Sequence, residues 1–333
     1  ANLSLSPSHP CFALMNGMLI DKGKKRLVSC SYGSLEKNCV VPEGILHIED
    51  RAFDGCEDLT GITLPKGLQS IGYSAFSGCS SLKKITLPKE LKHIAYGTFS
   101  SCDSLNSIKL PKGLQSIGDW AFSYCESLTS ITLPEGLQSI EDGAFYGCKS
   151  LTSIRLPKGL QLIGNEVFGN CSSLRNVSLP NSLKTMGDNP FVGTKAKLSL
   201  SSNHPYFTLV KGMLINKGTK RLVSHSYGGL GKKCIVPEGI LHIGRSAFHS
   251  CDSLTGIQLP EGLQSIGSDA FYECENLTDI TLPKGLQSIE YRTFSSCDSL
   301  TSVRLPEGLQ HIGDSAFSSC DSLTSVRLPE GLQ

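Results

Sequence analysis

Cysteine is the residue type in this 333-residue chain with the widest range of possible chemistry, because a thiolate can bind a metal, form a disulfide or attack a substrate. Of the 14 cysteines, ten recur with a period of 23 in two runs: Cys56, Cys79, Cys102, Cys125, Cys148 and Cys171, then Cys251, Cys274, Cys297 and Cys320. Zinc sites use short local pairs such as CxxC, and the sequence contains none. The spacing therefore predicts a repeated structural position, with no metal and no cofactor.

The ten evenly spaced cysteines, called the cysteine ladder here, are expected to be reduced. If successive repeats stack like strands, their Cα atoms lie about 4.8 Å apart, which is within the range of a disulfide. In a stack that is in register, however, their Cα–Cβ bonds run parallel instead of pointing at each other. A free cysteine also packs as a small apolar residue. We therefore predict a buried row of free thiols.

Other catalytic patterns are missing from the sequence. The eight histidines form no HExxH pair, and there is no GxSxG motif, glycine-rich phosphate loop or recognisable nucleophile–base pairing. Enzyme activity is therefore not expected. The net charge of +1, from 31 basic and 30 acidic residues, gives no reason to expect nucleic acid as a partner. No apolar run approaches the roughly 18 residues of a membrane span, so no direct membrane insertion is predicted.

The element that must position all these residues is a 23-residue repeat, marked by one proline in each copy. Twelve copies follow the pattern CxSLTSIxLPxGLQSIGxxAFxx. The prolines are Pro42, Pro65, Pro88, Pro111, Pro134, Pro157 and Pro180, then Pro237, Pro260, Pro283, Pro306 and Pro329. The spacing between Pro180 and Pro237 is wider, because it contains one period plus an insertion of 34.

The sequence also contains a duplication much longer than one 23-residue repeat. Residues 1–138 match residues 196–333 at an offset of 195, so the insertion is the same module that opens the chain. We expect a hairpin module at 1–34, a repeat block at 35–195, a second hairpin module at 196–230 and a second block at 231–333. The blocks should form one continuous solenoid, and both ends of the sequence read as truncated.

Within one repeat, apolar residues alternate with polar ones at Leu59, Ile62 and Leu64, which is typical of a strand with one buried face. Pro65 ends that strand because it has no amide hydrogen to donate. One repeat cannot bury its own apolar face, so the copies must stack. We predict a mainly β solenoid of parallel strands, with short 3₁₀ or helical turns around AFxxC. In the module, MLI (18–20) and RLVSC (26–30) predict a hairpin across DKGKK.

The repeated LxxIxLPxxLxxIGxxAFxxC resembles the short leucine-rich repeat of the BspA-like bacterial surface proteins. The segment FALMNGMLIDKGKKRLVSCSY resembles the hairpin element that interrupts arrays in that family. The resemblance implies an exported protein, extracellular or on the cell surface, of adhesin type. Its ligand would be a protein or a glycan, with extracellular matrix as one candidate. Certain protists carry similar arrays, so a protist source stays open beside a bacterial one.

Two surfaces are candidates for binding. By the resemblance, the LxxIxL strands line the concave face, and their outward positions vary on an otherwise uniform scaffold. The candidate residues there are Lys84, Lys109, Thr132, Arg155, Arg304 and Arg327. The rival surface is an aromatic platform of Tyr73, Tyr96 and Trp120 on neighbouring turns. A structural spacer that presents other domains is the alternative function, and it would need neither surface.

Overall fold

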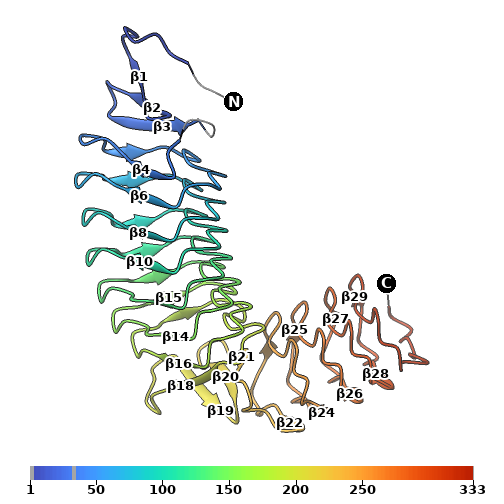
Figure 1. Ribbon diagram of the computed structural model, residues 1–333. Helices are drawn as coiled ribbons and strands as arrows, with labels where there is room; N and C mark the ends of the chain where they lie inside the picture. Colours follow the sequence, from blue (N-terminus) through green and yellow to red (C-terminus); the bar gives the residue numbers. More distant parts are fainter. Residues whose placement is uncertain (1–3, 32–34, 333) are drawn as a thin grey trace. The chain divides into compact units, whose positions relative to one another are not determined.

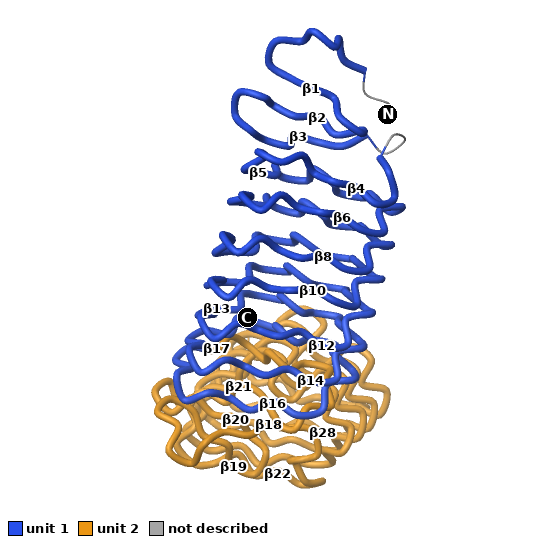
Figure 2. Tube along the Cα trace, turned by 60° about the vertical axis from the view of Figure 1, so that its left-hand side comes forward, with its two compact units in different colours: residues 1–185 blue, residues 186–333 orange. Residues whose placement is uncertain are grey.

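The structure is a computed structural model, and it describes residues 4–31 and 35–332 (Figure 1). The chain forms two compact units, residues 1–185 and 186–333, which Figure 2 colours separately. In each unit the chain winds into a stack of 23-residue turns, as the repeat predicts. No residue in the two described ranges is helical, so the short helices allowed around AFxxC are replaced by tight turns.

The LxxIxL segments form the predicted parallel strands. In the first unit these are β4 (Asn38–Val40), β6 (Gly61–Thr63), β8 (Lys84–Thr86), β10 (Ser107–Lys109), β12 (Ser130–Ile131), β14 (Ser153–Ile154) and β16 (Asn176–Leu179). Strands β4, β6, β8 and β10 pair in this order as one sheet. In β8 and β10 the middle residue is buried and both neighbours are exposed, so the outward positions form a surface.

A second row of strands follows each proline and was not predicted. Its members in the first unit are β5 (His47–Ile48), β7 (Ser70–Ile71), β9 (His93–Ile94), β11 (Ser116–Ile117), β13 (Ser139–Ile140) and β15 (Leu162–Ile163), with β17 (Thr185–Met186) at the boundary. Strands β9, β11, β13 and β15 pair in parallel, each with the strand of the next turn. Each strand is two residues long, which is too short to show an alternating pattern.

The second unit repeats this plan. Its elements are β18 (Lys197–Leu200), β19 (Phe207–Val210), β20 (Met213–Asn216), β21 (Arg221–His225), β22 (Lys233–Ile235), β23 (His242–Ile243), β24 (Gly256–Gln258), β25 (Ser265–Ile266), β26 (Asp279–Thr281), β27 (Ser288–Ile289), β28 (Ser302–Arg304) and β29 (His311–Ile312). Strands β22, β24, β26 and β28 form one parallel sheet.

The two hairpin modules have the same structure, as their sequences predict. In the first, β1 (Phe12–Met15), β2 (Met18–Asp21) and β3 (Arg26–Cys30) form an antiparallel meander. Strands β19, β20 and β21 repeat it residue for residue, including the register shift in the middle of the second pairing. Strand β3 then pairs in parallel with β5, and β21 with β23, so each module is stacked on its own repeats. The strand at 12–15 was not foreseen.

A stack of phenylalanine rings runs through the core of each unit. From Phe53 to Phe168 the centroids of successive rings are 5.0–5.7 Å apart and the rings are nearly parallel. The backbone beside them alternates its hydrogen bonds. The Phe76 amide donates to Thr98 O one turn away (2.9 Å), whereas the Cys79 amide donates to Phe76 O in its own turn (3.2 Å). Every second amide donates to the neighbouring turn, and the amides between donate within their own turn. This alternation is incompatible with the hydrogen bonds of a helix or of a regular strand.

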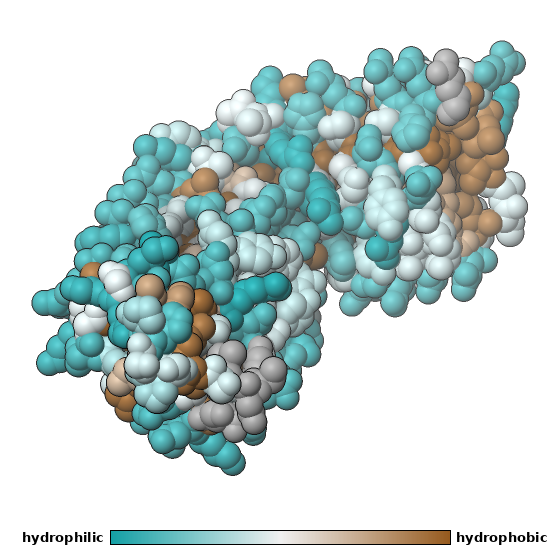
Figure 3. Space-filling model, turned by 90° about the horizontal axis from the view of Figure 1, so that it is seen from above, coloured by the Kyte–Doolittle hydropathy of each residue, from teal (hydrophilic) through white to brown (hydrophobic). Residues whose placement is uncertain are grey.

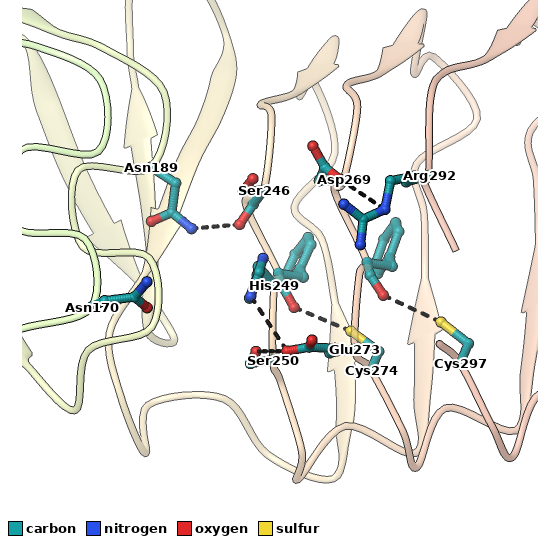
Figure 4. A network of polar contacts seen from close by, with 12 residues as sticks. Asn170, Asn189, Ser246, His249, Ser250, Asp269, Glu273, Cys274, Arg292 and Cys297 are labelled. Atoms are coloured by element: carbon teal, nitrogen blue, oxygen red, sulfur yellow. Dashed lines mark hydrogen bonds and ion pairs between the residues drawn. The ribbon is translucent and has the colours of Figure 1, made fainter. Parts of the chain in front are cut away.

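The cysteine ladder lies beside these rings. In eight of the ten, all but Cys56 and Cys251, the Sγ donates to the carbonyl of the phenylalanine 26 residues earlier, at 3.1 Å for Cys274 and 3.2 Å for Cys297 (Figure 4). The prediction of burial is confirmed for nine of the ten, and Cys320 is half-exposed. All ten are free thiols. Burial raises the pKa of the Cys79 thiol to about 12, which keeps it protonated and unreactive.

Candidate binding surfaces

The outward side chains of the even-numbered strands from β4 to β14 form what we call the strand face of the first unit. Pairing of β8 with β10 places Lys84 opposite Ser107 and Thr86 opposite Lys109. Thr132 and Arg155 follow β12 and β14 directly, in the same repeat position as Lys109. All four candidate residues of this unit are exposed. The structure thus places Lys84, Lys109, Thr132 and Arg155 on one face.

A hollow of about 550 Å³ lies on this face over β4, β6 and β8, and we call it the first strand-face hollow. Gly61 and Asn38 both line it, and a Cβ at Gly61 would meet Asn38 Oδ1 at 2.9 Å, so the glycine leaves space for the Asn38 side chain. The Val40 side chain is 59% exposed and supplies apolar surface, while Lys66 and Lys84 supply positive charge. An apolar surface with two ammonium groups suits a partner with carboxylates next to aliphatic or sugar-ring carbon.

Arg155 has an acidic neighbour on its own chain. Its Nη2 lies 3.6 Å from Oε1 of Glu135, and both side chains are mostly exposed. An exposed ion pair of this kind contributes little, about 0–1 kcal/mol, because water and salt screen it. A carboxylate of a partner can therefore replace Glu135 as the ion-pair partner of Arg155 with little loss of free energy.

The strand face of the second unit carries the opposite charge at its hollow. This second strand-face hollow, of about 260 Å³, includes Glu261 and Asp279 in its lining. At the offset of 195, these two residues stand where Lys66 and Lys84 stand in the first unit. Arg304 ends β28, opposite Thr281, and Arg327 lies exposed in a segment that is not a strand.

The aromatic platform is only partly assembled. Tyr73 and Tyr96 are 59% and 52% exposed, and with Asp50, Arg51 and Ser74 they line a hollow of about 590 Å³ that we call the aromatic hollow. Asp50 and Arg51 were not among the residues predicted from the sequence. The carboxylate Oδ1 of Asp50 accepts a hydrogen bond from the Tyr73 amide (2.8 Å), which holds the aspartate beside the ring.

Trp120 belongs to a separate cluster. Its ring lies 5.5 Å from that of Tyr146 and rests against Gly143, where a Cβ would be 2.7 Å from the indole. The residue is half-buried and does not line the aromatic hollow. Contact between turns therefore accounts for this side chain, and Tyr73 and Tyr96 are the exposed pair.

A charged network occupies the corresponding edge of the second unit (Figure 4). The Arg292 guanidinium lies 4.0 Å above the Tyr272 ring, and the Asp269 carboxylate is 3.9 Å from Arg292 and 3.5 Å from Arg245. Tyr291, at the position of Tyr96 in the duplicated block, is 48% exposed. This group was not predicted from the sequence, although the offset of 195 relates Tyr291 to Tyr96.

Within residues 4–31 and 35–332, no three or more His, Cys, Asp or Glu side chains are grouped so as to hold a metal ion. In that described part of the chain, no helix has the length and apolar character needed to cross a membrane. In the space-filling view, most of the visible surface is hydrophilic, with apolar side chains in small groups and one more extended apolar area toward the right-hand end (Figure 3).

The stacked turns, the inward Leu, Ile, Phe and Cys ladders and the varied outward positions define a leucine-rich-repeat solenoid. The family model described as BspA type leucine rich repeat region (6 copies) matches residues 29–118, 92–204 and 230–333. Since these matches cover well over half of the sequence, the chain belongs to the BspA-type leucine-rich-repeat family. No curated protein matches the sequence significantly.

Solved structures of bacterial leucine-rich-repeat proteins share the fold. A leucine rich cell surface protein from Faecalibacterium prausnitzii is 22% identical with a TM-score of 0.72, over 98% of this chain and 91% of the other. The pneumococcal vaccine antigen PcpA is 23% identical with a TM-score of 0.71, over 96% and 82%. A leucine-rich repeat protein from Bacteroides ovatus is 27% identical with a TM-score of 0.53, over 96% and 93%.

Proposed function

We propose that this chain is a bacterial cell-surface or secreted binding protein of adhesin type, which recognises a protein or glycan through the strand face of its first unit. The observation that carries the proposal is the exposed row of Lys84, Lys109 and Arg155 on stacked turns with parallel strands, beside the first strand-face hollow. Side chains on a rigid sheet lose little freedom on binding, so their contacts convert efficiently into affinity.

Family membership supports a binding role, because solenoids present extended surfaces on which several repeats contact one partner. The match is to a repeat family and not to a catalytic one, so the chain is not assigned an enzymatic reaction. The cell-surface description of the Faecalibacterium protein supports the location. In this proposal the blocks at 35–195 and 231–333 carry the binding faces, including Arg304 and Arg327 in the second. The modules at 1–34 and 196–230 are structural.

The chemistry of the first strand face indicates an extended ligand with spaced carboxylates. Lys109 and Arg155 are two turns apart, which corresponds to roughly 10 Å between backbone positions at normal strand spacing. Acidic segments of extracellular matrix proteins and acidic glycans both offer carboxylates at such intervals. Attraction of this kind weakens as the salt concentration rises.

The test begins with an array of glycans and extracellular matrix proteins, followed by variants measured against any ligand captured. We expect Lys109→Ser with Arg155→Ser to lower affinity roughly tenfold or more, because two charged contacts are lost. Tyr73→Ser with Tyr96→Ser is the matched control, since it removes two exposed side chains from neighbouring turns on the aromatic hollow. Binding that survives the first pair and is lost with the second would move the site to the aromatic hollow.

A structural spacer is the second candidate function. The near-neutral net charge and the internal pairing of Arg155 with Glu135 favour it, because a stalk needs only a solvated surface. If the array captures no ligand and neither pair of substitutions changes adhesion of a cell that displays the chain, the spacer becomes the preferred function.

A further inference from the structure

The two hairpin modules begin the phenylalanine stack with different residues. Cys30 precedes Phe53 by one repeat period, and its amide donates to Ala52 O (2.9 Å) just as the Phe53 amide donates to Ala75 O (2.8 Å). Cys30 therefore stands at the phenylalanine position of the repeat. His225 stands there in the second module, with its ring nearly parallel to Phe248 at 6.5 Å. One structural position thus holds a thiol in one copy and an imidazole in the other.

Cys56, the first member of the cysteine ladder, faces Cys30. In the other ladder cysteines of the first unit, Cys79 to Cys171, the Sγ contacts a carbonyl oxygen at 3.1–3.2 Å. The Cys56 Sγ instead lies 2.8 Å from the Sγ of Cys30. This contact is shorter than the sulfur–oxygen ones although sulfur is the larger atom, and it approaches the S–S bond length of about 2.05 Å. A small rotation of either side chain would close it.

We propose that Cys30 and Cys56 form a disulfide that fastens the first hairpin module to the first repeat, by exchange with a low-molecular-weight disulfide. The Cys30 thiolate attacks one sulfur of the small disulfide, which breaks its S–S bond and releases one thiolate. Cys56 then attacks the Cys30 sulfur of the mixed disulfide and releases the second thiolate. The two protein thiols are oxidised, the small disulfide is reduced to two thiols, and the two protein protons pass to the departing thiolates.

The surroundings of the pair favour this reaction over reactions of the other buried thiols. The hydrogen bond from the Cys56 thiol lowers the pKa of Cys30, against the opposing effect of burial, so Cys30 is the attacking group. Cys30 is 9% exposed and Cys56 is 4% exposed, whereas Cys79 is fully buried. Cys39 is also buried, but its Sγ contacts Met18 Sδ at 3.5 Å. The proposal does not depend on the proposed binding function.

The second module is a natural control within the chain. His225 Nε2 lies 3.5 Å from the Sγ of Cys251, so the same position faces the same ladder residue without a second sulfur. The strands of the two modules are otherwise alike. Stacking of a module on its repeats therefore does not require the linkage, and the linkage can be added or removed by exchanging single residues.

The test treats the full native chain with oxidised glutathione, followed by alkylation in acid, trypsin digestion and mass spectrometry without reduction. Cys30, Cys39 and Cys56 fall on separate tryptic peptides, 27–37, 38–51 and 52–66. We expect peptides 27–37 and 52–66 to be joined, with the loss of one hydrogen atom from each thiol. Exposed Cys11 should become glutathionylated, which shows that the reagent was active.

Matched variants sharpen the result. The linkage should persist in Cys39→Ser and disappear in Cys30→Ser, and His225→Cys should gain a second linkage to Cys251. In the linked protein, amide exchange in β2 and β3 should slow by roughly a hundredfold, since closing this loop restricts the opened state. Linkage of either peptide to 38–51, or no linkage while Cys11 is fully modified, would overturn the proposal. Failure of His225→Cys to link would refute the argument from the ladder position.

Discussion

Replacing Phe122 with alanine tests whether the phenylalanine stack holds the first unit together. Phe122 is fully buried, and its ring lies 5.4 Å from that of Phe99 and 5.3 Å from that of Phe145, nearly parallel to both. Truncation of a core phenylalanine costs about 3–5 kcal/mol. Each aromatic pair that is lost is worth about 0.5–1.5 kcal/mol beyond its buried area. We therefore expect Phe122→Ala to lower the free energy of unfolding of this unit by about 4–5 kcal/mol.

The loss should be greatest in the turns next to the substitution, because each repeat of a solenoid contacts only its neighbours. Urea unfolding followed by circular dichroism gives the free energy, and hydrogen exchange shows which turns open. Phe122→Leu is a control that retains most of the volume, and Tyr96→Ala removes a ring that is 52% exposed. A cost below about 1 kcal/mol for Phe122→Ala, or equal to that of Tyr96→Ala, would refute the assignment of the stack as the stabilising core.

The other predictions concern titration, thiols and close contacts. Burial lowers the pKa of His225, with a weaker opposing effect of its hydrogen bond to Ala247 O, so the unfolded chain binds the proton first. The melting temperature of the second unit should therefore fall as the pH drops below about 6.5, and His225→Phe should reduce that dependence; an unchanged slope would contradict it. In thiol titration of the reduced native protein, Cys11 should react fast, and the fully buried members of the cysteine ladder, such as Cys79 and Cys125, only after denaturation. Rapid reaction of most of the thiols in the native state would contradict the burial argument. Gly143→Ala should destabilise the first unit by about 1–3 kcal/mol, because its Cβ would strike the Trp120 ring and its φ is positive; Gly136→Ala, with no contact below 3.4 Å, is the matched control for thermal unfolding.

The stacked core could be predicted from the sequence because its spacing is fixed by the period. Once the equivalent of Pro65 recurs in all twelve repeats and the equivalent of Cys56 in ten of them, residues of the same type must lie over one another. The second row of strands could not be read in this way. Its hydrogen bonds join residues one full turn apart, such as Ile71 with Ile48, and each strand has only two residues. Local alternation, which identifies ordinary strands, is absent from such a segment.

The sequence predicts which candidate residues share a surface, but it does not predict the contacts between their side chains. The period placed Lys109, Thr132 and Arg155 in one column, and the structure agrees that they share a face. The approach of Glu135 to Arg155 depends on rotatable bonds of two long side chains, so the spacing could not reveal it. The burial of Trp120, in contrast, has a readable cause. The residue one turn later is Gly143, and a missing side chain at that position leaves room for an indole ring.

The contrast between inward and outward positions explains how one scaffold can acquire two different faces. An inward residue such as Phe122 is packed against its neighbours in the adjacent turns, so substitution there strongly lowers the free energy of unfolding. An outward residue contacts mainly water, and its replacement changes stability by about 0.5 kcal/mol or less. After the duplication, Lys84 and Asp279 came to occupy equivalent positions with opposite charge, each lining a strand-face hollow. Lys66 and Glu261 differ in the same way. In the proposed function, a ligand rich in carboxylates would be attracted to the first hollow and repelled by the second, so two blocks with the same kind of core would select different partners.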